Sequence, residues 1–438
     1  MKISYYSLGC KVNLYESEAI INQFIDKGFT LSKFDDVCDV YLINTCSITE
    51  VSDAKSRKII RQAIKSNPNG VVAVMGCYAQ LKPEDIKKID GVDVLIGTNN
   101  RDKMFDLIME ALNNKQSISC INDILETKTY EELKINRFND KTRGFVKIED
   151  GCDNYCSYCT IPYARGHVRS RKKEDVISEI EILSNAGIKE IVLAGINTGH
   201  YGHDLADYDF ADLLTDICCQ VKNLGKLRIS SIEMTEITYK LLEVMKKYNN
   251  HFCNQIHVPL QGGCDNTLKR MHRKYNTMEY KAKIDLIRSY FPDINITTDV
   301  IAGFSGETDD DFNNSLMFID SITFGEMHVF PFSRRPRTVA YNYPNQVSPE
   351  VKKERVKKLL ELNAKKALEY RNNYSNKEII VLVERKKNGL LFGHTSNYLE
   401  VAFSGNAKDN EYANVLLTEI NYPVCKGVEI KWNLQIWI

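Results

Sequence analysis

Short apolar runs alternate with longer amphipathic stretches in the first quarter of the chain. This alternation is typical of a parallel sheet covered by helices, and it predicts a doubly wound α/β domain over residues 1–115. A polar stretch without a clear period, residues 116–141, is typical of a linker. The apolar runs predict strands at 3–8, 40–44, 71–75 and 92–96, and the amphipathic stretches predict helices at 14–27, 53–65, 83–89 and 101–112.

The alternation resumes with longer units over residues 142–374. Six strand-then-helix units fit a partial α/β barrel, whose chemistry lies at the carboxyl ends of the strands. A long helix with a basic excess is predicted at 349–373. The six strands are predicted at 144–148, 190–194, 226–232, 255–259, 295–301 and 326–330.

The pattern changes again over residues 375–438, where short strands occur with little helix. Such a unit fits a small antiparallel β-barrel. Its strands are predicted at 378–384, 389–393, 399–403, 414–420 and 428–432.

Composition places the chain among folded globular proteins, because 43% of its 438 residues are hydrophobic and 26% are charged. Lys plus Arg and Asp plus Glu both total 58, so any nucleic-acid site must be a local patch. We expect no signal sequence, since residues 1–10 show no charged-then-apolar pattern, and no membrane segment, since no apolar run reaches about 18 residues. The 13 cysteines are therefore expected in a reducing cytoplasm, where clustered cysteines are more often metal ligands or catalysts.

Cys152, Cys156 and Cys159 form a CxxxCxxC motif just after the first predicted barrel strand. Three thiolates on one loop suit a 4Fe-4S cluster and leave one iron without a protein ligand. A structural zinc site is the alternative, and its fourth ligand would have to be His167. The spacing favours the cluster.

Cys10, Cys46 and Cys77 each follow a predicted strand of the first domain. A single cysteine in such a place is more often part of a buried core. Because the carboxyl ends of parallel strands share one edge of the sheet, the common position of all three predicts one site. Three ligands there imply a second iron-sulfur cluster. The seven other cysteines share no ligand spacing and receive no role: Cys38, Cys120, Cys218, Cys219, Cys253, Cys264 and Cys425.

Three features together resemble the methylthiotransferase family of radical S-adenosylmethionine enzymes, over almost the whole chain. They are LGCKVNLYESE with NTCSIT in the first domain, GCDNYCSYCTIPYARGHVRSR in the barrel, and a tail similar to the family's TRAM domain. HVPLQGGCDNTLKRMHR also resembles a family motif. It departs at Gly263-Cys264, where Gly-Ser is usual, which affects a hydroxyl contact and no cluster ligand.

LGCKVNLYESE and IPYARGHVRSR look most like the branch that acts on N6-threonylcarbamoyladenosine at position 37 of tRNA. The resemblance implies that a methylthio group replaces the hydrogen on adenine C2, through two 4Fe-4S clusters and S-adenosylmethionine. The radical comes from the cofactor, so no side chain is expected to be catalytic. One alternative substrate is isopentenyladenosine in tRNA, and another is a ribosomal protein side chain. A non-catalytic iron-sulfur RNA-binding protein is disfavoured by the CxxxCxxC motif.

The same resemblance implies partners and contacts. The partners are the tRNA anticodon stem-loop and an electron donor such as a flavodoxin or ferredoxin, with no membrane and with a monomeric protein. Ordinary strand-end polar residues are the alternative for two of the cofactor contacts, Glu233 and Gln261. The residues expected to contact S-adenosylmethionine are Tyr158, Gly195, Asn197, Glu233 and Gln261.

Three basic clusters follow predicted barrel strands, on the face where substrate would enter. Phosphate contacts from them would orient an anticodon loop. A charged surface in solvent is the alternative for any one cluster, and Tyr163 and Phe332 are candidates for stacking on the adenine. The clusters are Arg165, Arg169, Arg171, Lys172 and Lys173; Lys269, Arg270, Arg273 and Lys274; and Arg334, Arg335 and Arg337.

Overall fold

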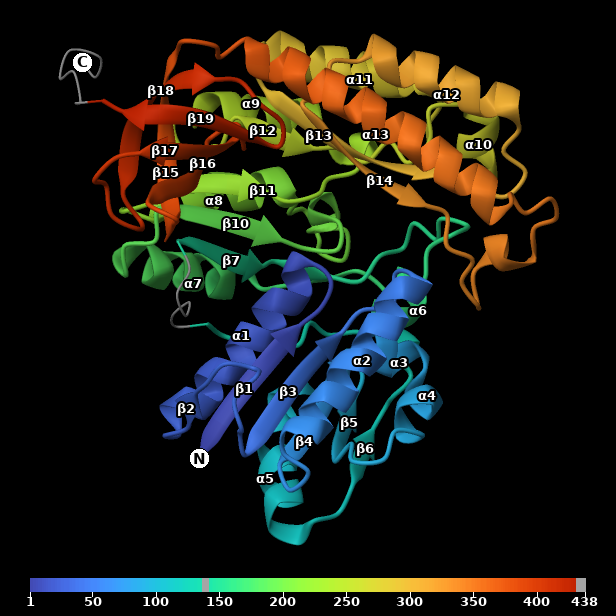
Figure 1. The fold of residues 1–438 in the computed structure, drawn as a ribbon, viewed down its shortest axis with the longest axis vertical. Helices are drawn as coiled ribbons and strands as arrows, with labels where there is room; N and C mark the ends of the chain where they lie inside the picture. Colours follow the sequence, from blue (N-terminus) through green and yellow to red (C-terminus); the bar gives the residue numbers. More distant parts are fainter. Residues whose placement is uncertain (136–141, 431–438) are drawn as a thin grey trace.

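The computed structural model describes residues 1–135 and 142–430, which form an N-terminal sheet domain, a barrel and a small C-terminal barrel (Figure 1). Part of the predicted linker and the end of the strand predicted at 428–432 lie outside the described residues. Among the described residues, no helix is both long and apolar enough to cross a membrane.

The N-terminal domain is a parallel sheet in the order β2-β1-β3-β4-β5-β6. Helices α1 and α5 bury apolar side chains on one face, and α2, α3 and α4 do so on the other, which confirms the doubly wound fold. Three elements were not predicted, β2, α3 and β6, because each has at most five residues and shows no period. β6 lies within the predicted linker. The bounds are β1 (Lys2–Ser7), α1 (Lys11–Asp26), β2 (Thr30–Leu31), β3 (Val40–Thr45), α2 (Glu50–Ser66), β4 (Val71–Gly76), α3 (Cys77–Leu81), α4 (Pro83–Lys87), β5 (Val94–Ile96), α5 (Met104–Asn114) and β6 (Ile118–Cys120).

The central domain is the predicted six-stranded partial barrel. Two parallel sheets, β7-β10-β11 and β12-β13-β14, are joined by single bridges between β11 and the β12 region. The strands are β7 (Arg143–Lys147), β10 (Glu190–Ala194), β11 (Lys226–Ile229), β12 (Gln255–His257), β13 (Asn295–Ala302) and β14 (Glu326–Pro331).

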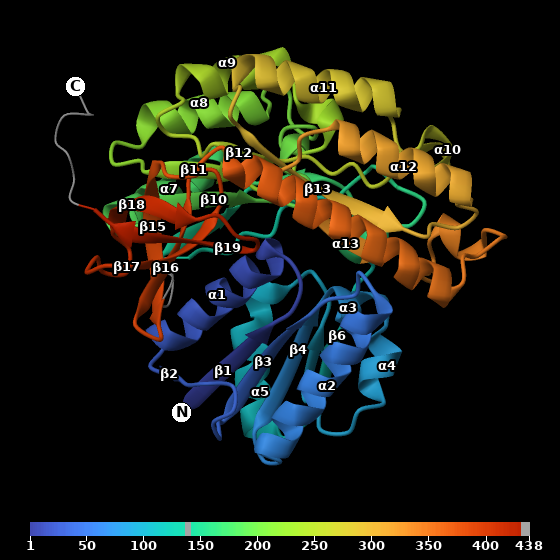
Figure 2. The same ribbon diagram turned by 45° about the horizontal axis from the view of Figure 1, so that its top comes forward.

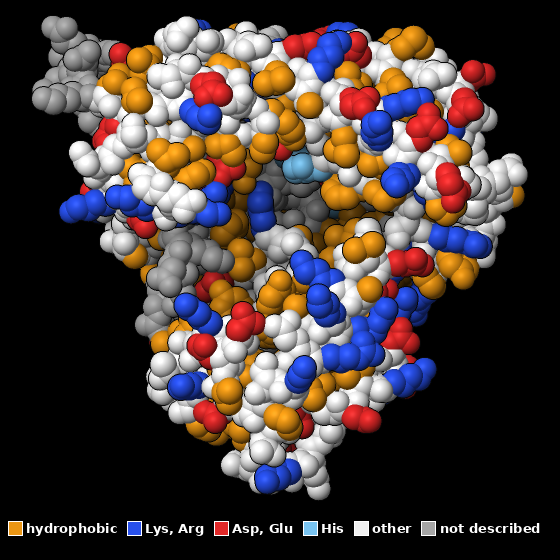
Figure 3. Space-filling model, in the orientation of Figure 1, with side chains coloured by type: hydrophobic (Ala, Val, Ile, Leu, Met, Phe, Trp, Pro, Cys, Tyr) orange, Lys and Arg blue, Asp and Glu red, His pale blue; other side chains and the backbone are white. Residues whose placement is uncertain are grey.

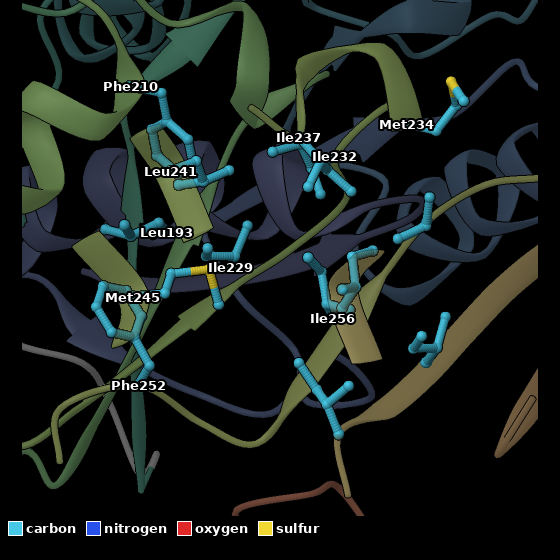
Figure 4. Packing of buried hydrophobic residues seen from close by; sticks show 14 of the residues in the cluster. Leu193, Phe210, Ile229, Ile232, Met234, Ile237, Leu241, Met245, Phe252 and Ile256 are labelled. Carbon is cyan, nitrogen blue, oxygen red and sulfur yellow. The ribbon is translucent and has the colours of Figure 1, made fainter. Parts of the chain in front are cut away.

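Helices cover the outside of this barrel, and the core lies between helices and strands (Figure 4). Leu193 and Ile229 of the strands are buried with Phe210 and Leu241 of the helices. The long predicted helix is α13. The bounds are α7 (Lys173–Asn185), α8 (Phe210–Gln220), α9 (Tyr239–Lys247), α10 (Asp265–Arg270), α11 (Thr277–Tyr290), α12 (Asp309–Ser321) and α13 (Pro349–Asn372); the short hairpin β8 (Glu149–Asp150) with β9 (Arg169–Ser170) and the helix α6 (Ile161–Arg165) follow β7.

Helix α1 of the N-terminal domain packs on the inner face of β7 (Figure 2). Phe145 of β7 packs with Tyr15 and Ala19 of α1. The Lys147 ammonium donates to Glu16 at 2.9 Å. The N-terminal domain therefore closes the side of the barrel next to β7.

The C-terminal unit is a closed barrel in the order β15-β16-β17-β19-β18. All its pairings are antiparallel except β17 with β19, which is parallel, so the expectation of a wholly antiparallel barrel is wrong at one seam. Tyr398, after β16, lies 4.6 Å from the Arg228 guanidinium and 5.3 Å from that of Arg143. This loop thus covers the amino ends of the barrel strands. The bounds are β15 (Glu378–Lys387), β16 (Leu390–Thr395), β17 (Glu400–Ser404), β18 (Tyr412–Glu419) and β19 (Val424–Glu429).

Candidate active site

Cys10, Cys46 and Cys77 follow the neighbouring strands β1, β3 and β4, as the sequence predicts. A Cβ placed on Gly9 would lie 3.1 Å from the Cys46 sulfur, so the first two turns touch. Cys46 and Cys77 are buried and Cys10 is exposed. Burial raises the pKa of Cys77 to about 12, with a further rise from the nearby Cys46 and Cys10 thiols and an opposing effect of Arg165. Three converging thiols with one open side fit a cluster bound by three cysteines. Metal binding would deprotonate these thiols to thiolates.

Cys152, Cys156 and Cys159 lie on the loop between β8 and α6. Cys159 N donates to Cys156 O at 2.9 Å, and Ile161 N donates to the Cys159 sulfur at 3.4 Å. Burial raises the pKa of Cys159 to about 12, and the Cys156 thiol raises it further. The loop therefore gathers three thiols around one point, which fits the second predicted cluster.

The loop with these cysteines starts at a glycine that cannot be replaced without a clash. Gly151 has a φ of +88°, and a Cβ there would lie 1.9 Å from the carbonyl oxygen of His167. Cys152 N also donates to Gly166 O at 3.0 Å. The return of the chain after α6 thus packs directly against the start of the cysteine loop.

A buried ion-pair network joins the two cysteine groups. Arg165 donates to Asn13 at 2.7 Å, to Glu16 at 2.8 Å and to Asp150 at 3.0 Å. Asn13 is three residues from Cys10, and Asp150 is two residues from Cys152. In the same network Arg101 pairs with Glu16, and Lys147 pairs with both Glu16 and Asp150. It fixes the N-terminal domain against the cysteine loop.

This network corrects the first predicted RNA-binding cluster. The side chains of Arg165 and Arg171 are fully buried, and that of Arg169 is 4% exposed. Arg171 pairs with Glu132 and, at 2.7 Å, with Glu179. These arginines cannot reach an RNA phosphate, because they lie inside the protein with carboxylate partners. In the sequence these basic residues have no acidic neighbour, which is why the sequence predicts that they bind RNA. Their acidic partners come from other parts of the chain and meet them only in the folded protein.

Two further predicted RNA contacts are also wrong. Arg335 is buried and donates to Asp53 at 2.7 Å, which ties β14's end to α2. Arg273 has a 3% exposed side chain, pairs with Glu233 and donates to the Cys156 sulfur at 3.2 Å. Phe332, a stacking candidate, is buried in an apolar cluster.

The remaining predicted RNA contacts are accessible. Lys274, Arg334 and Arg337 are exposed. Arg270 is half-buried and pairs with Asp311 at 3.0 Å. A cleft beside Cys156 is lined by Glu233 and Arg273 together with Lys274. Figure 3 shows that the surface between the barrel and the N-terminal domain is hollowed.

The residues predicted to contact S-adenosylmethionine lie on the loops that follow β8, β10, β11 and β12. Tyr158 packs against an apolar cluster that contains Phe304. Asn197 N donates to Glu149 at 3.1 Å, and Asn197 Oδ1 accepts from Glu233 N at 3.3 Å. Gln261, on the loop after β12, has a φ of +66°.

Glu149 is a site residue that the sequence did not indicate. It is fully buried, and burial with the neighbouring Asp150 raises its pKa well above the ordinary value. A Cβ on Gly195 would lie 2.6 Å from its carboxyl oxygen. Glu149 Oε1 and Asn197 Nδ2 are buried without a hydrogen-bond partner among the described residues. Two such orphaned atoms beside the cysteine loop fit a polar ligand such as the methionine end of the cofactor.

Comparison with known proteins gives two family matches. Residues 2–97 match the family described as "Uncharacterized protein family UPF0004", and residues 146–319 match the radical SAM superfamily.

Several curated proteins are similar over nearly the full length. The threonylcarbamoyladenosine tRNA methylthiotransferase MtaB of Bacillus subtilis (strain 168) is 41% identical over 97% of this chain and 95% of its own. The protein of the same name from Aquifex aeolicus (strain VF5) is 34% identical over 95% of this chain and 100% of its own. A tRNA-2-methylthio-N(6)-dimethylallyladenosine synthase of Thermoanaerobacter sp. (strain X514) is 36% identical over 95% and 90%.

Solved structures share the fold. The radical S-adenosylmethionine methyltransferase TsrM from Kitasatospora setae, with cobalamin and a [4Fe-4S] cluster bound, matches with a TM-score of 0.58 and 12% identity. It covers 77% of this chain and 73% of its own. OxsB, a cobalamin-dependent S-adenosylmethionine radical enzyme, matches with a TM-score of 0.51 and 13% identity, over 82% and 56%.

Proposed function

Because the chain belongs to the radical S-adenosylmethionine tRNA methylthiotransferase family, we propose that its two cysteine groups and the lumen between them form one active site. The reaction adds a methylthio group to C2 of N6-threonylcarbamoyladenosine in tRNA. The relatives named for this nucleoside support it, and dimethylallyladenosine, the nucleoside of other similar relatives, is the second candidate. The main support for a single active site is the buried network of Glu16, Arg165 and Asp150, which joins the cysteine groups across two domains.

The hydrogen on adenine C2 is not acidic enough for a side chain to remove it. When bound, the two 4Fe-4S clusters and S-adenosylmethionine supply the one-electron chemistry, the methyl group and the site of sulfur attachment. Cys10, Cys46 and Cys77 would hold one cluster. The other would be held by Cys152, Cys156 and Cys159.

The other residues of the site bind and orient the cofactor and the substrate, and they exclude water. Asn197 and Glu149 would contact the methionine end of the cofactor, and Tyr158 its adenine. Helix α1 fills the side of the barrel beside β7, and the loop with Tyr398 covers the amino ends of the strands. The lumen is thereby shielded from water on two sides.

The exposed basic residues Lys274, Arg334 and Arg337 would contact the anticodon stem-loop, with position 37 directed into the hollow of Figure 3. The reductant would be a flavodoxin or ferredoxin. The protein would act as a monomer in the cytoplasm, where its tRNA substrate is found.

Nucleoside mass spectrometry of tRNA from a strain that lacks this gene tests the substrate. We expect methylthio-threonylcarbamoyladenosine to disappear and to return when the gene is restored. Unchanged levels would refute the assignment. Loss of the methylthio form of isopentenyladenosine instead would support the second candidate.

The assignment of cysteines to clusters needs a separate measurement. Reconstituted protein should hold about eight iron atoms per chain, as two clusters of four. Replacing Cys10, Cys46 and Cys77 with Ala should leave about four. An unchanged iron content, or normal methylthiolation by that variant, would contradict a cluster at the sheet edge. Replacing Cys38, Cys253 and Cys425 provides the matched control, because these buried cysteines have no assigned role.

A further inference from the structure

Two histidines and an aspartate lie together on β12, β13 and β14, three neighbouring strands of the barrel. His257 Nε2 lies 3.3 Å from Asp299 Oδ2, and His328 Nδ1 lies 3.1 Å from Asp299 Oδ1. The two imidazole rings stack with an angle of 26° between their planes and centroids 5.4 Å apart, so both present a nitrogen to the same carboxylate. One ligand atom from each of the three side chains lies within 4.8 Å of the other two. We call these three side chains the His-Asp-His cluster.

The His-Asp-His cluster faces the lumen of the barrel. Side chains along a strand alternate between its two faces. Val258, Val300 and Met327, each next in sequence to a member of the cluster, are buried in the core between the strands and the outer helices. The members of the cluster therefore point to the other side, into the lumen. The exposed fraction of their side chains rises from 13% at His257 to 54% at His328, so the cluster is open on the His328 side.

A chain of hydrogen bonds orients the His257 ring. Its Nδ1 lies 2.9 Å from Thr297 Oγ1, which also accepts from Gln255 Nε2 at 2.9 Å. The Arg228 guanidinium donates to Gln255 Oε1 at 3.1 Å, so the amide nitrogen of Gln255 is the atom turned toward Thr297. When Nδ1–H of His257 donates to the Thr297 hydroxyl, the lone pair of Nε2 is left for a metal ion. A hydrogen bond of this kind on the second ring nitrogen orients most histidines that bind metals.

The spacing within the His-Asp-His cluster fits a metal ion better than hydrogen bonds alone. Ligand atoms about 2.0–2.1 Å from a tetrahedral zinc ion lie about 3.3 Å from one another. The two contacts of Asp299 with the histidines, 3.3 Å and 3.1 Å, match this separation. A hydrogen bond between a charged imidazole and a carboxylate is usually shorter, about 2.7–2.9 Å. Imidazole together with carboxylate is also a ligand set that suits divalent ions of the first transition row.

We propose that His257, Asp299 and His328 bind one divalent first-row metal ion, such as zinc, in the lumen of the barrel. Three protein ligands leave a coordination position open, which would take water or an anionic oxygen ligand. The site is separate from both cysteine groups, because none of its ligands is a thiol. The inference goes beyond the proposed function, since binding of the ion requires neither RNA nor turnover.

Equilibrium dialysis of the full-length, cluster-loaded protein against Zn²⁺ tests the site, with zinc and iron measured together by mass spectrometry. We expect about one zinc ion per chain in addition to about eight iron atoms. Asp299→Asn and His257→Gln should each weaken zinc binding at least about tenfold, because each removes a ligand. Thr297→Val, which removes only the hydroxyl behind His257, should weaken it by about tenfold. The iron content verifies that each variant is folded with its cysteine sites filled.

His394→Phe provides the matched control. His394 Nδ1 lies 2.9 Å from Glu384 in the C-terminal barrel, so this substitution removes a histidine paired with one carboxylate far along the chain from the cluster. The variant should retain the zinc.

X-ray absorption at the zinc edge identifies the ligands. We expect nitrogen and oxygen atoms at about 2.0–2.1 Å from the zinc. Sulfur at about 2.3 Å would overturn the inference, because it would place the zinc on cysteines. So would protein that binds no zinc, or zinc binding that Asp299→Asn leaves unchanged. If zinc binds as expected and the tRNA is not modified, only the proposed function fails, so the two failures remain distinguishable.

Discussion

The Arg165 guanidinium, just after the CxxxCxxC loop, donates to the Glu16 carboxylate of α1 at 2.8 Å, and both side chains are fully buried. This contact joins the first domain to the barrel at the level of the two cysteine groups. Each domain contributes one charge of the pair, and neither charge could be buried without its partner from the other domain.

Glu16→Gln should destabilise the protein by about 3–5 kcal/mol, because it leaves Arg101, Lys147 and Arg165 with Asp150 as their shared carboxylate. Urea unfolding of the cluster-loaded protein measures the loss. Glu181→Gln, at an exposed position of α7, is the control and should change stability by less than about 0.5 kcal/mol. Similar effects of the two substitutions would contradict a structural role for the network.

Arg334 and Arg335 are neighbours in sequence with opposite exposure. Arg335→Met should cost about 3 kcal/mol of stability, because it removes the buried one of the two cations that pair with the buried Asp53 carboxylate and leaves the partly exposed Lys82. Arg334→Met should leave stability unchanged and weaken tRNA binding, with a smaller salt dependence. Anisotropy titrations at two salt concentrations, with unfolding curves, separate the two effects. If Arg335→Met lost tRNA affinity at unchanged stability, the structural role assigned to Arg335 would be wrong.

Gly151→Ala should remove the iron of the CxxxCxxC cluster, since its Cβ would lie 1.9 Å from the His167 carbonyl oxygen. Gly187 provides the control, because its φ of +87° is similar and nothing lies within 4 Å of a Cβ there. Gly187→Ala should cost about 1 kcal/mol and keep all iron. The comparison of iron contents separates the clash from the backbone strain. Full iron in both variants would show that the loop can move.

His200, at the end of a short 3-10 helix, should make stability fall as the pH is lowered. Burial lowers its pKa to about 4, so between about pH 6.5 and pH 4 the unfolded chain binds a proton that the folded protein does not. Stability is therefore lost as the pH falls through this window. Unfolding curves at pH 7 and pH 5 should show a drop of about 1–2 kcal/mol that His200→Asn reduces.

The exposed His203, whose ring stacks on His200 at 4.7 Å, serves as the comparison. His203→Asn should keep most of the pH dependence. If His200→Asn and the native protein show the same drop, another group is responsible.

The periodicity of apolar residues determined the architecture of this protein. Parallel strands followed by helices can close only as layered α/β units, so the barrel strands and β1, β3, β4 and β5 of the first domain were predictable to within a few residues, whereas the short edge strands β2 and β6 were not. The placement of Cys10, Cys46 and Cys77 at one sheet edge follows from the same rule.

The tertiary structure alone decided the roles of the charged residues. Arg165, Arg171 and Arg335 stand in basic runs, yet they are buried against Glu16, Glu179 and Asp53. These partners lie up to 282 residues away along the chain. The sequence shows how many basic residues a segment carries. Only the folded structure shows which carboxylates are buried with them as ion-pair partners. The same reason hid Glu149, since its contacts with Gly195 and Asn197 form only when the chain after β10 packs against β8.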